Sequence, residues 1–337
     1  MSWFVEVVQS CSEQWAGDDW RAEAVEWIAS VTRAHGLTIT GECAQPRIRF
    51  WSTQLTVPTD AGLLWFKENC PGQDFEARLV SVLAELVPDQ VLAPLAVEET
   101  RGWMLTPDRG PTLANGHDAD LDVWRRVVGE WAELQRRLAG HTERLLAVGV
   151  TAMPPAAAAR YVAERIDVYA ARPAGDAGHI DAETTDRLRA LLPDVRRWAE
   201  QLDGTGLPST LDHNDLHANN AFVPRHGERR LRFFDFGDAV LSHPLCSLMI
   251  PLRVLADTLK TDSSDPRLRT VVDAYLEPWT DLADLDTLRA AVEPATRLAM
   301  LNRGESWRRV LPYANAEELK EWGVAATWWL TGLLQGA

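Results

Sequence analysis

Residues 210–237 decide how this chain is organised, and they read T-L-D-H-N-D-L-H-A-N-N-A-F-V-P-R-H-G-E-R-R-L-R-F-F-D-F-G. Two short apolar runs lie within this stretch, at residues 221–223 and 231–234, with the basic turn R-H-G-E-R-R near its middle. Apolar runs of this length on either side of a glycine-containing turn are typical of a β-hairpin. We therefore expect two paired strands here, with polar residues gathered at their ends.

Three of these polar residues have the chemistry of a phosphoryl-transfer site. Asp215 precedes the first strand, Asn220 lies at its start, and Asp235 follows the second strand. Asn220 and Asp235 supply oxygen atoms of the kind that bind a hard cation, and Asp215 can orient a hydroxyl. Together they are the groups needed for transfer from a metal-bound nucleotide. In the alternative interpretation, these side chains only cap turns, as Asp and Asn often do.

The same stretch resembles the catalytic loop and the metal loop of the aminoglycoside phosphotransferase and choline kinase-like family. The usual pattern of that family is H-G-D-x-H-x-x-N, followed by I-D-[FW]-G/E-D. Asn214 stands where the family has glycine, and we expect it to be tolerated because Asn enters left-handed backbone conformations more readily than most residues. The matching positions are His213, Asp215, His217, Asn220 and the run Asp235-Phe236-Gly237-Asp238.

The resemblance implies the two-lobed α+β fold of the protein kinases, with a small antiparallel-sheet N-lobe and a larger helical C-lobe. It also implies that Asp215 is the catalytic aspartate and that Asn220 and Asp235 hold Mg²⁺ on ATP. We expect the N-lobe at residues 1–105 and the C-lobe at residues 106–337. A length of 337 residues agrees with two domains of about 150 residues each.

The composition and net charge limit the binding partners and the cellular location that we expect for this protein. No run approaches the roughly 20 apolar residues of a membrane span, and the N-terminus lacks the basic start of a signal peptide. The four cysteines form no C-x-x-C pair, which is typical of reduced thiols, so we expect a cytoplasmic protein. The net charge of −15 argues against a nucleic-acid partner and suits a cationic acceptor.

The N-lobe should begin with strands at residues 37–40, 47–57 and 61–67. Residues 41–46 would then be the loop that covers the phosphates, although a single glycine there does not by itself indicate nucleotide binding. Lys67 closes the third strand, where the family has its phosphate-binding lysine. The alternative is a solvated lysine at the end of a strand.

A predicted helix follows, with Asp74 as its cap and apolar residues from Phe75 onward at helical spacing. Glu76 lies in its first turn, nine residues after Lys67. Kinase-like sites pair the strand lysine with a glutamate of this helix, and the short gap favours Glu76 over Glu85. In the alternative interpretation, Glu76 only complements the helix dipole.

Two further strands, at residues 90–97 and 102–105, complete the expected five-stranded N-lobe. The chain then turns from apolar to turn-forming residues, which resembles the hinge between the lobes in this family. We expect backbone groups near Leu105, Thr106 and Pro107 to bind the adenine edge of the nucleotide.

The C-lobe is expected to be helical. After Asp238 the chain departs from the family's usual D-P-x-x-D-L-A, so an aspartate that braces the catalytic loop is missing, and Ser247 and His243 are its candidate replacements. The A-P-E segment of protein kinases is absent from the sequence, which argues for a small-molecule acceptor. The helices are predicted from Asp120 to Leu138 and at about residues 156–171, 182–202, 248–258, 268–276, 285–301 and 316–334.

These features predict an ATP- and Mg²⁺-dependent kinase that phosphorylates a hydroxyl of a small acceptor, such as an aminoglycoside, an amino sugar or another metabolite alcohol. The alternatives are a catalytically silent nucleotide sensor and, less favoured, a protein kinase. We expect residues 301–307 to lie near the acceptor, with Glu305 selecting a cationic one. The competing interpretation is a helix end or kink at Gly304 with Trp307 in the core.

Overall fold

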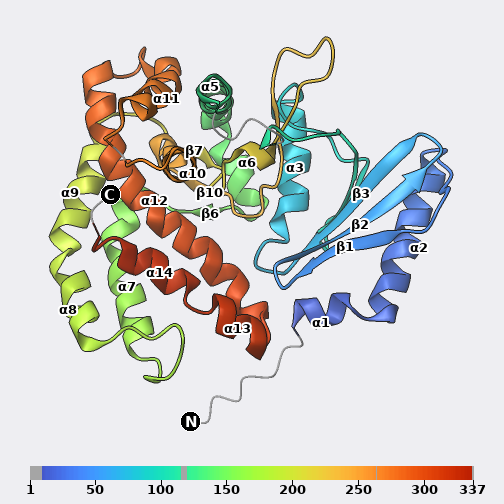
Figure 1. The fold of residues 1–337 in the computed structure, drawn as a ribbon, viewed down its shortest axis with the longest axis horizontal. Helices are drawn as coiled ribbons and strands as arrows, with labels where there is room; N and C mark the ends of the chain where they lie inside the picture. The colour runs from blue at the N-terminus through green and yellow to red at the C-terminus, as the bar shows by residue number, and fades with distance from the viewer. Residues whose placement is uncertain (1–9, 115–119, 263, 336–337) are drawn as a thin grey trace.

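The computed structural model of the protein describes residues 10–114, 120–262 and 264–335. It has two lobes side by side, a sheet lobe and a larger helical lobe (Figure 1). The predicted two-lobed α+β fold is confirmed. The chain crosses between the lobes after β5, and the division at residue 105 stays a prediction.

Five antiparallel strands build the sheet lobe, in the order β1-β2-β3-β5-β4. Buried positions alternate with partly exposed ones along β2, as in a strand with one face on a core. Helix α2 covers the sheet, and its Trp20 and Trp27 rings contact Phe66 of β3. The elements are α1 (Cys11–Trp15), α2 (Asp18–Ala34), β1 (Ala44–Arg49), β2 (Ser52–Thr59), β3 (Gly62–Asn69), α3 (Phe75–Leu86), β4 (Ala96–Glu98) and β5 (Trp103–Pro107).

The start of the sheet differs from the prediction. Residues 37–40 contribute only an isolated bridge between Ile39 and Thr59, and the first strand is β1. The loop expected at residues 41–46 is wrong, because its second half lies within β1; the turn between β1 and β2 is at Phe50 and Trp51 instead. Pro46 is accommodated because β1 is an edge strand whose register shifts between Ala44 and Arg47.

The strand predicted at residues 90–97 is also too long, since only β4 (Ala96–Glu98) is formed. The helix that was expected after Asp74 is present as α3, but the Asp74 side chain makes no capping hydrogen bond. Its carboxylate instead pairs with Arg78 at 3.2 Å. The spacing of the apolar residues therefore predicted the start of α3 correctly, whereas the capping role predicted for Asp74 is wrong.

Helices dominate the second lobe. The helix predicted at residues 182–202 is divided at Leu191 into α8 and α9, with Pro193 in the first turn of α9. The predicted C-terminal helix is likewise divided into α13 and α14. The helices are α5 (Leu121–Leu138), α6 (Thr142–Ala147), α7 (Ala158–Ala170), α8 (Ala182–Ala190), α9 (Leu192–Asp203), α10 (Met249–Leu259), α11 (Pro266–Leu276), α12 (Leu285–Val310), α13 (Ala316–Trp322) and α14 (Ala325–Gly332).

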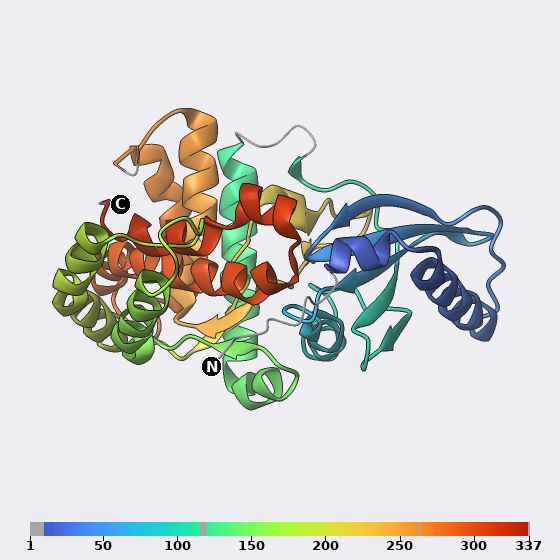
Figure 2. The same cartoon turned by 90° about the horizontal axis from the view of Figure 1, so that it is seen from below.

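Helix α12 runs nine residues beyond its predicted end at Leu301, and it does not stop at Gly304. A Cβ atom on Gly304 would lie 3.4 Å from the Trp329 Cβ and 3.5 Å from the Ala326 carbonyl oxygen. These are ordinary van der Waals distances, so α14 packs directly on α12 at Gly304, and the glycine neither ends nor kinks the helix. Figure 2 shows α12 crossing the helical lobe towards the sheet lobe.

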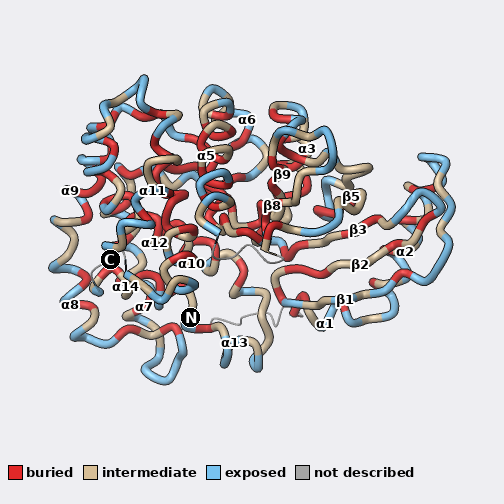
Figure 3. Tube along the Cα trace, turned by 45° about the horizontal axis from the view of Figure 1, so that its top comes forward, coloured by how far each residue is buried: buried red, intermediate tan, exposed pale blue. Residues whose placement is uncertain are grey.

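Two small sheets present the loops of the central stretch. Strands β6 (Thr151–Ala152), β10 (Val240–Ser242) and β7 (Thr210–Asp212) form one, in the order β6-β10-β7. The predicted hairpin is confirmed as β8 (Ala221–Phe222) and β9 (Arg232–Phe233), each shorter than expected. Buried residues, red in Figure 3, run through these sheets and along α5 and α12.

Among the described residues, we find no helix that is both long and apolar enough to cross a membrane.

Candidate active site

The loop between β7 and β8 turns sharply at Asn214, whose φ angle is 60°. This is the left-handed conformation that we expected Asn to tolerate in place of glycine. The Asn214 side chain also makes hydrogen bonds that a glycine could not make. Its Nδ2 donates to the backbone oxygens of Asp238 at 3.0 Å and of Asn302 at 2.9 Å. The residue therefore joins the predicted catalytic loop to the predicted metal loop and to α12.

Asp212 braces the same loop from within the protein. Its Oδ1 accepts hydrogen bonds from the Ser247 hydroxyl at 2.6 Å and from the Asn214 N–H at 3.0 Å, and its Oδ2 accepts from Asn302 Nδ2 at 3.1 Å. Burial raises the pKa of Asp212, while these donors oppose the rise. Of the two candidate replacements for the missing aspartate, Ser247 is the one that contacts this loop; His243 pairs with Thr205.

Two groups that can carry positive charge hold the Asp215 carboxylate. Arg303 Nη2 lies 3.0 Å from Asp215 Oδ1, and His217 Nε2 lies 3.4 Å from Oδ2. The His217 Nδ1 accepts from the Asn219 N–H at 3.2 Å, so Nε2 is the protonated nitrogen. Burial would raise the pKa of Asp215, but the charge of Arg303 and then the hydrogen bond of His217 hold this pKa well below its usual range. Asp215 is therefore an ionised acceptor and a weak base.

Arg303 is a site residue that the sequence did not single out. Its guanidinium also pairs with Asp238 Oδ2 at 2.5 Å and donates to the Asn214 carbonyl at 3.2 Å. The guanidinium thus ties α12 to both loops. No local motif indicates this role, because Arg303 lies far along the chain in a helix with several other arginines.

Removing Arg303 should destabilise the protein. Arg303→Ala would leave Asp215 and Asp238 as negative charges without their shared cation. Breaking a buried ion pair costs about 3–5 kcal/mol, and the partial exposure of both carboxylates reduces this to about 2–3 kcal/mol. Urea unfolding should show this loss. The control is Arg289→Ala in the same helix, whose guanidinium pairs with Asp273 on the surface. An equal, small loss for both variants would contradict the bridging role.

Asn220 and Asp235 come together through the hairpin. The Phe234 N–H donates to the Asn220 carbonyl at 3.1 Å, which places the end of β9 beside Asn220. Asn220 Nδ2 donates to the Asp215 carbonyl at 3.0 Å, so the amide oxygen is the atom left to bind a ligand. Among the described residues, no three His, Cys, Asp or Glu side chains gather as a metal site. An ion here would need further ligands from phosphates and water, as Mg²⁺ usually has.

Lys67 lies between two carboxylates. Its Nζ is 2.7 Å from Glu76 Oε2 and 2.6 Å from Asp235 Oδ1. Burial would lower the pKa of Lys67, but the charges of Asp235 and Glu76 outweigh it and raise this pKa above its ordinary value. Glu76 is buried, and its Oε1 accepts from the Phe236 N–H at 2.8 Å. The structure therefore brings Lys67 and Glu76 together with Asp235 and Phe236 of the predicted metal loop.

The three residues proposed to face the base lie at the end of β5. Leu105 is opposite Phe66 of β3, and its carbonyl accepts from the Leu95 N–H at 2.7 Å on the side of β4. The described ladder between β4 and β5 stops at Leu105. The Asp108 N–H donates to the Leu63 carbonyl at 2.9 Å, towards β3. Backbone groups alternate sides along a strand, so those of Pro107 face the side where β4 has ended.

The chain is similar to a known protein family and to several solved structures. A model of the phosphotransferase enzyme family matches residues 59–291. No curated protein matches this chain. A type I macrolide 2'-phosphotransferase is 14% identical, with 91% of this chain and 96% of that chain covered and a TM-score of 0.57. The macrolide 2'-phosphotransferase of Brachybacterium faecium is 17% identical, with 93% and 98% covered and a TM-score of 0.55.

The ethanolamine kinase of Plasmodium vivax is 13% identical, with 87% of this chain and 83% of that chain covered and a TM-score of 0.60. At these identities the solved structures support the fold alone. The family model spans more than half of the chain and shows the family. The chain therefore belongs to the phosphotransferase enzyme family and is a phosphotransferase with a two-lobed, protein kinase-like fold.

Proposed function

We propose that the protein is an ATP-dependent small-molecule kinase that transfers the γ-phosphoryl group of Mg-ATP to a hydroxyl. One observation carries the proposal. Asn220 donates to the Asp215 carbonyl, Phe234, the residue before Asp235, donates to the Asn220 carbonyl, and Lys67 reaches Asp235 from the other lobe. The arrangement supports the proposal, in which Asp215 would orient the acceptor hydroxyl, the Asn220 and Asp235 oxygens would bind the metal, and Lys67 would bind the phosphates.

Asn220 and Asp235 would hold Mg²⁺, and their surroundings fit that role. The Asn220 oxygen is the free end of an amide whose nitrogen is fixed. Asp235 contacts Lys67 through Oδ1, and its side chain is 38% exposed, so it has an oxygen to offer a cation. When bound, Mg²⁺ neutralises charge on the phosphates. Lys67, oriented by Glu76, would bind the phosphates from the sheet lobe.

Asp215 would orient the acceptor hydroxyl and accept its proton late in the transfer. A carboxylate whose pKa is held low by Arg303 is a poor base, but phosphoryl transfer depends mostly on positioning and on charge neutralisation. A fixed, ionised carboxylate is suited to positioning. In this proposal, Arg303 and His217 set the direction of the Asp215 oxygens.

The adenine would lie beside the end of β5. Because the backbone of Leu105 faces β4 and that of Asp108 faces β3, the Pro107 carbonyl points to the side that β4 leaves open, and in this proposal the Arg109 N–H faces the same side. We propose these two groups as the acceptor and donor for the adenine edge. They extend by two residues the segment that the sequence suggested, Leu105, Thr106 and Pro107.

The acceptor would lie against α12. A cavity of about 110 Å³ is present between α7 and α12, and its walls include Tyr161, Leu301 and Asn302. Asn302 precedes Arg303, so the cavity lies next to the residues that hold the catalytic loop. Glu305 is neutralised by Arg308 at 2.6 Å and accepts from the Tyr161 hydroxyl at 2.9 Å. Glu305 is therefore not proposed to select a cation, and a cationic acceptor stays a prediction.

ATP turnover across a panel of alcohols tests this function. Aminoglycosides, macrolides, choline and ethanolamine would be incubated with Mg-ATP, and phosphorylated products would be identified by mass spectrometry. At least one acceptor should give a monophosphate with the wild-type protein and none with Asp215→Asn. Binding of Mg-ATP without transfer to any acceptor would favour the silent nucleotide sensor instead.

The ion pair of Lys67 and Glu76 gives a second test. Lys67→Met should raise the KM for ATP about tenfold or more, and Glu76→Gln should do so less. Contacting charged residues couple by about 0.5–3 kcal/mol, so the double variant should lose less than the product of the two single losses. Lys320→Met, at an exposed lysine paired with Glu317, is the control and should change nothing. Strictly multiplicative losses would remove Glu76 as the partner of Lys67.

A further inference from the structure

The turn between β1 and β2 takes the place of a glycine-rich loop, yet it is short and consists of two aromatic residues. Phe50 and Trp51 form the turn, and Arg49 pairs with Ser52 to close it. Ser52 is opposite Asn69 and Gln54 is opposite Lys67. The turn therefore lies three strand positions beyond Lys67, about 10 Å along the strand direction.

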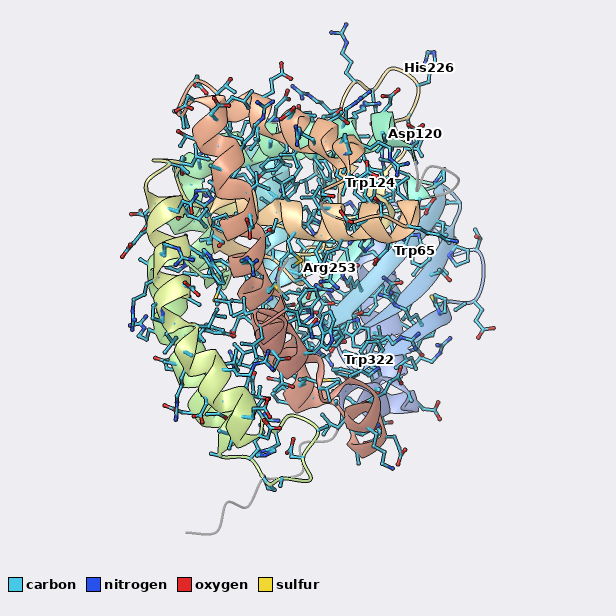
Figure 4. All side chains as sticks on the ribbon, turned by 60° about the vertical axis from the view of Figure 1, so that its left-hand side comes forward. Trp65, Asp120, Trp124, His226, Arg253 and Trp322 are labelled. Carbon is cyan, nitrogen blue, oxygen red and sulfur yellow. The ribbon has the colours of Figure 1, made fainter. Side chains whose placement is uncertain are left out.

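Trp51 reaches from this turn to the other lobe. Its ring centroid is 5.8 Å from that of Trp307 in α12 and 5.5 Å from that of Trp322 in α13, and both contacts are edge-on. Trp307 and Trp322 are themselves stacked at 5.2 Å. We refer to Trp51, Trp307 and Trp322 as the tryptophan clamp. Figure 4 labels Trp322 where the C-terminal helices meet the sheet lobe.

Other contacts hold the same boundary. Phe50 is buried and its ring contacts Trp51 at 4.7 Å, so the turn is anchored in its own lobe as well. A Cβ atom on Gly72, just after β3, would lie 2.1 Å from the Arg309 carbonyl oxygen, so only glycine allows α12 to pass this close. Val310 of α12 belongs to the hydrophobic cluster of the sheet lobe.

The clamp adjoins the catalytic groups. Trp307 follows Arg303 by four residues, about one helical turn, and Arg303 holds Asp215. On the sheet side, the strand register puts Trp51 three positions along β2 from the residue opposite Lys67. The clamp is therefore connected to Lys67 through the sheet and to Asp215 through α12, the two residues between which the proposed function places the phosphates.

We propose that Trp51 is a positioning residue, held by Trp307 and Trp322, that keeps the turn between β1 and β2 closed over the phosphates of the nucleotide. This proposal rests on the proposed nucleotide site. A flexible loop must be ordered when the nucleotide binds, and that ordering lowers affinity. A turn that is already fixed by packing avoids most of this loss. In this proposal, the clamp takes over the function that the glycine-rich loop has in kinases, so the turn between β1 and β2 does not need glycines.

The proposal predicts an effect that depends on the phosphates. Trp51→Ala removes two aromatic contacts between the lobes, which should raise the dissociation constant of Mg-ATP about tenfold. The dissociation constant of adenosine should change less than about twofold, because the base lies at the end of β5, away from the turn. Trp51→Phe, which keeps an aromatic ring, should restore most of the affinity for Mg-ATP.

Calorimetric titration of the full chain with Mg-ATP and with adenosine measures both constants. Trp322→Ala removes the clamp from the other lobe and should reproduce the effect, even if Trp51→Ala fails to fold. Trp328→Ala is the control, because Trp328 is 45% exposed on α14 and contacts Trp329, outside the clamp. It should leave both constants unchanged.

The outcomes separate the two proposals. If the wild-type protein binds no Mg-ATP, the proposed function fails. If it binds Mg-ATP and both Trp51→Ala and Trp322→Ala bind equally well, the clamp is not a positioning device and the proposed function stands. Equal losses for Mg-ATP and adenosine would also overturn the proposal, because they would indicate a general loss of structure.

Discussion

Asp215→Asn should lower turnover by a factor on the order of a thousand or more, while the affinity for Mg-ATP changes little. The substitution keeps the size of the side chain but removes the charge that attracts the acceptor hydroxyl. Losses of this order follow the removal of a group that acts mainly in the transition state. Steady-state kinetics with the acceptor found in the screen would give the turnover, and calorimetry would give the affinity for the nucleotide.

The contacts of Arg303 indicate that Asp215→Asn should affect turnover without disrupting the fold. Its charge pairs with Asp215 at 3.0 Å, so the neutral amide of the variant would no longer form this ion pair, although Arg303 would keep Asp238 at 2.5 Å. The fold should therefore survive the substitution. Asp203→Asn, at an exposed position at the end of α9, is the matched control. Turnover near that of the wild-type protein would remove Asp215 from the mechanism.

The sequence predicted the parts of the site that lie close together along the chain. Asp215, Asn220 and Asp235 fall within one stretch, where short spacing and a hairpin leave few ways to arrange them. Lys67 and Glu76 are nine residues apart, at the end of a strand and the start of a helix. The positive φ of Asn214 follows from the turn and from the few residues that tolerate it.

The sequence did not predict the contacts made by α12. Arg303, Trp307 and Asn302 are remote from the residues they contact, and their spacing within a helix shows which face they share but not what lies opposite. Glu305 illustrates the consequence. From the sequence it is a carboxylate near the expected acceptor, whereas in the structure the Tyr161 hydroxyl of α7 donates to it and Arg308, three residues on in the same helix, neutralises it. Only the path of the helix decides between these interpretations.

In the sheet lobe, the sequence predicted strands but did not predict the position of the turn between them. Residues 37–57 are rich in strand-forming residues, so the pattern predicted strands but not where the turn between them falls. Pro46 is the last residue of the segment that we expected to be a loop, yet an edge strand with a shifted register accommodates it. The turn instead lies at two aromatic residues, Phe50 and Trp51, which local turn preferences would not select. Packing across the lobes outweighed the local preference.

Asp235→Ala should weaken the binding of Mg-ATP about tenfold to a hundredfold and leave the binding of metal-free ATP unchanged or improved. The affinity changes for Mg-ATP and for metal-free ATP differ in direction because Asp235 acts on the nucleotide in two ways. With Mg²⁺ present, its carboxylate is a proposed ligand, and even the outer partners of metal ligands affect metal affinity by this factor. Without Mg²⁺, the same negative charge repels the phosphates.

The structure makes this substitution a clean test. Lys67 keeps Glu76 at 2.7 Å when Asp235 is removed, so the lysine is not left without a partner in the protein. The Phe236 N–H remains bound to Glu76 at 2.8 Å, which holds the backbone of the metal loop in place. Titrations of ATP with excess Mg²⁺ and with a chelator would be compared for the variant and the wild-type protein. An equal weakening in both conditions would show that Asp235 supports the loop and does not bind the metal, because a structural loss has no reason to depend on Mg²⁺.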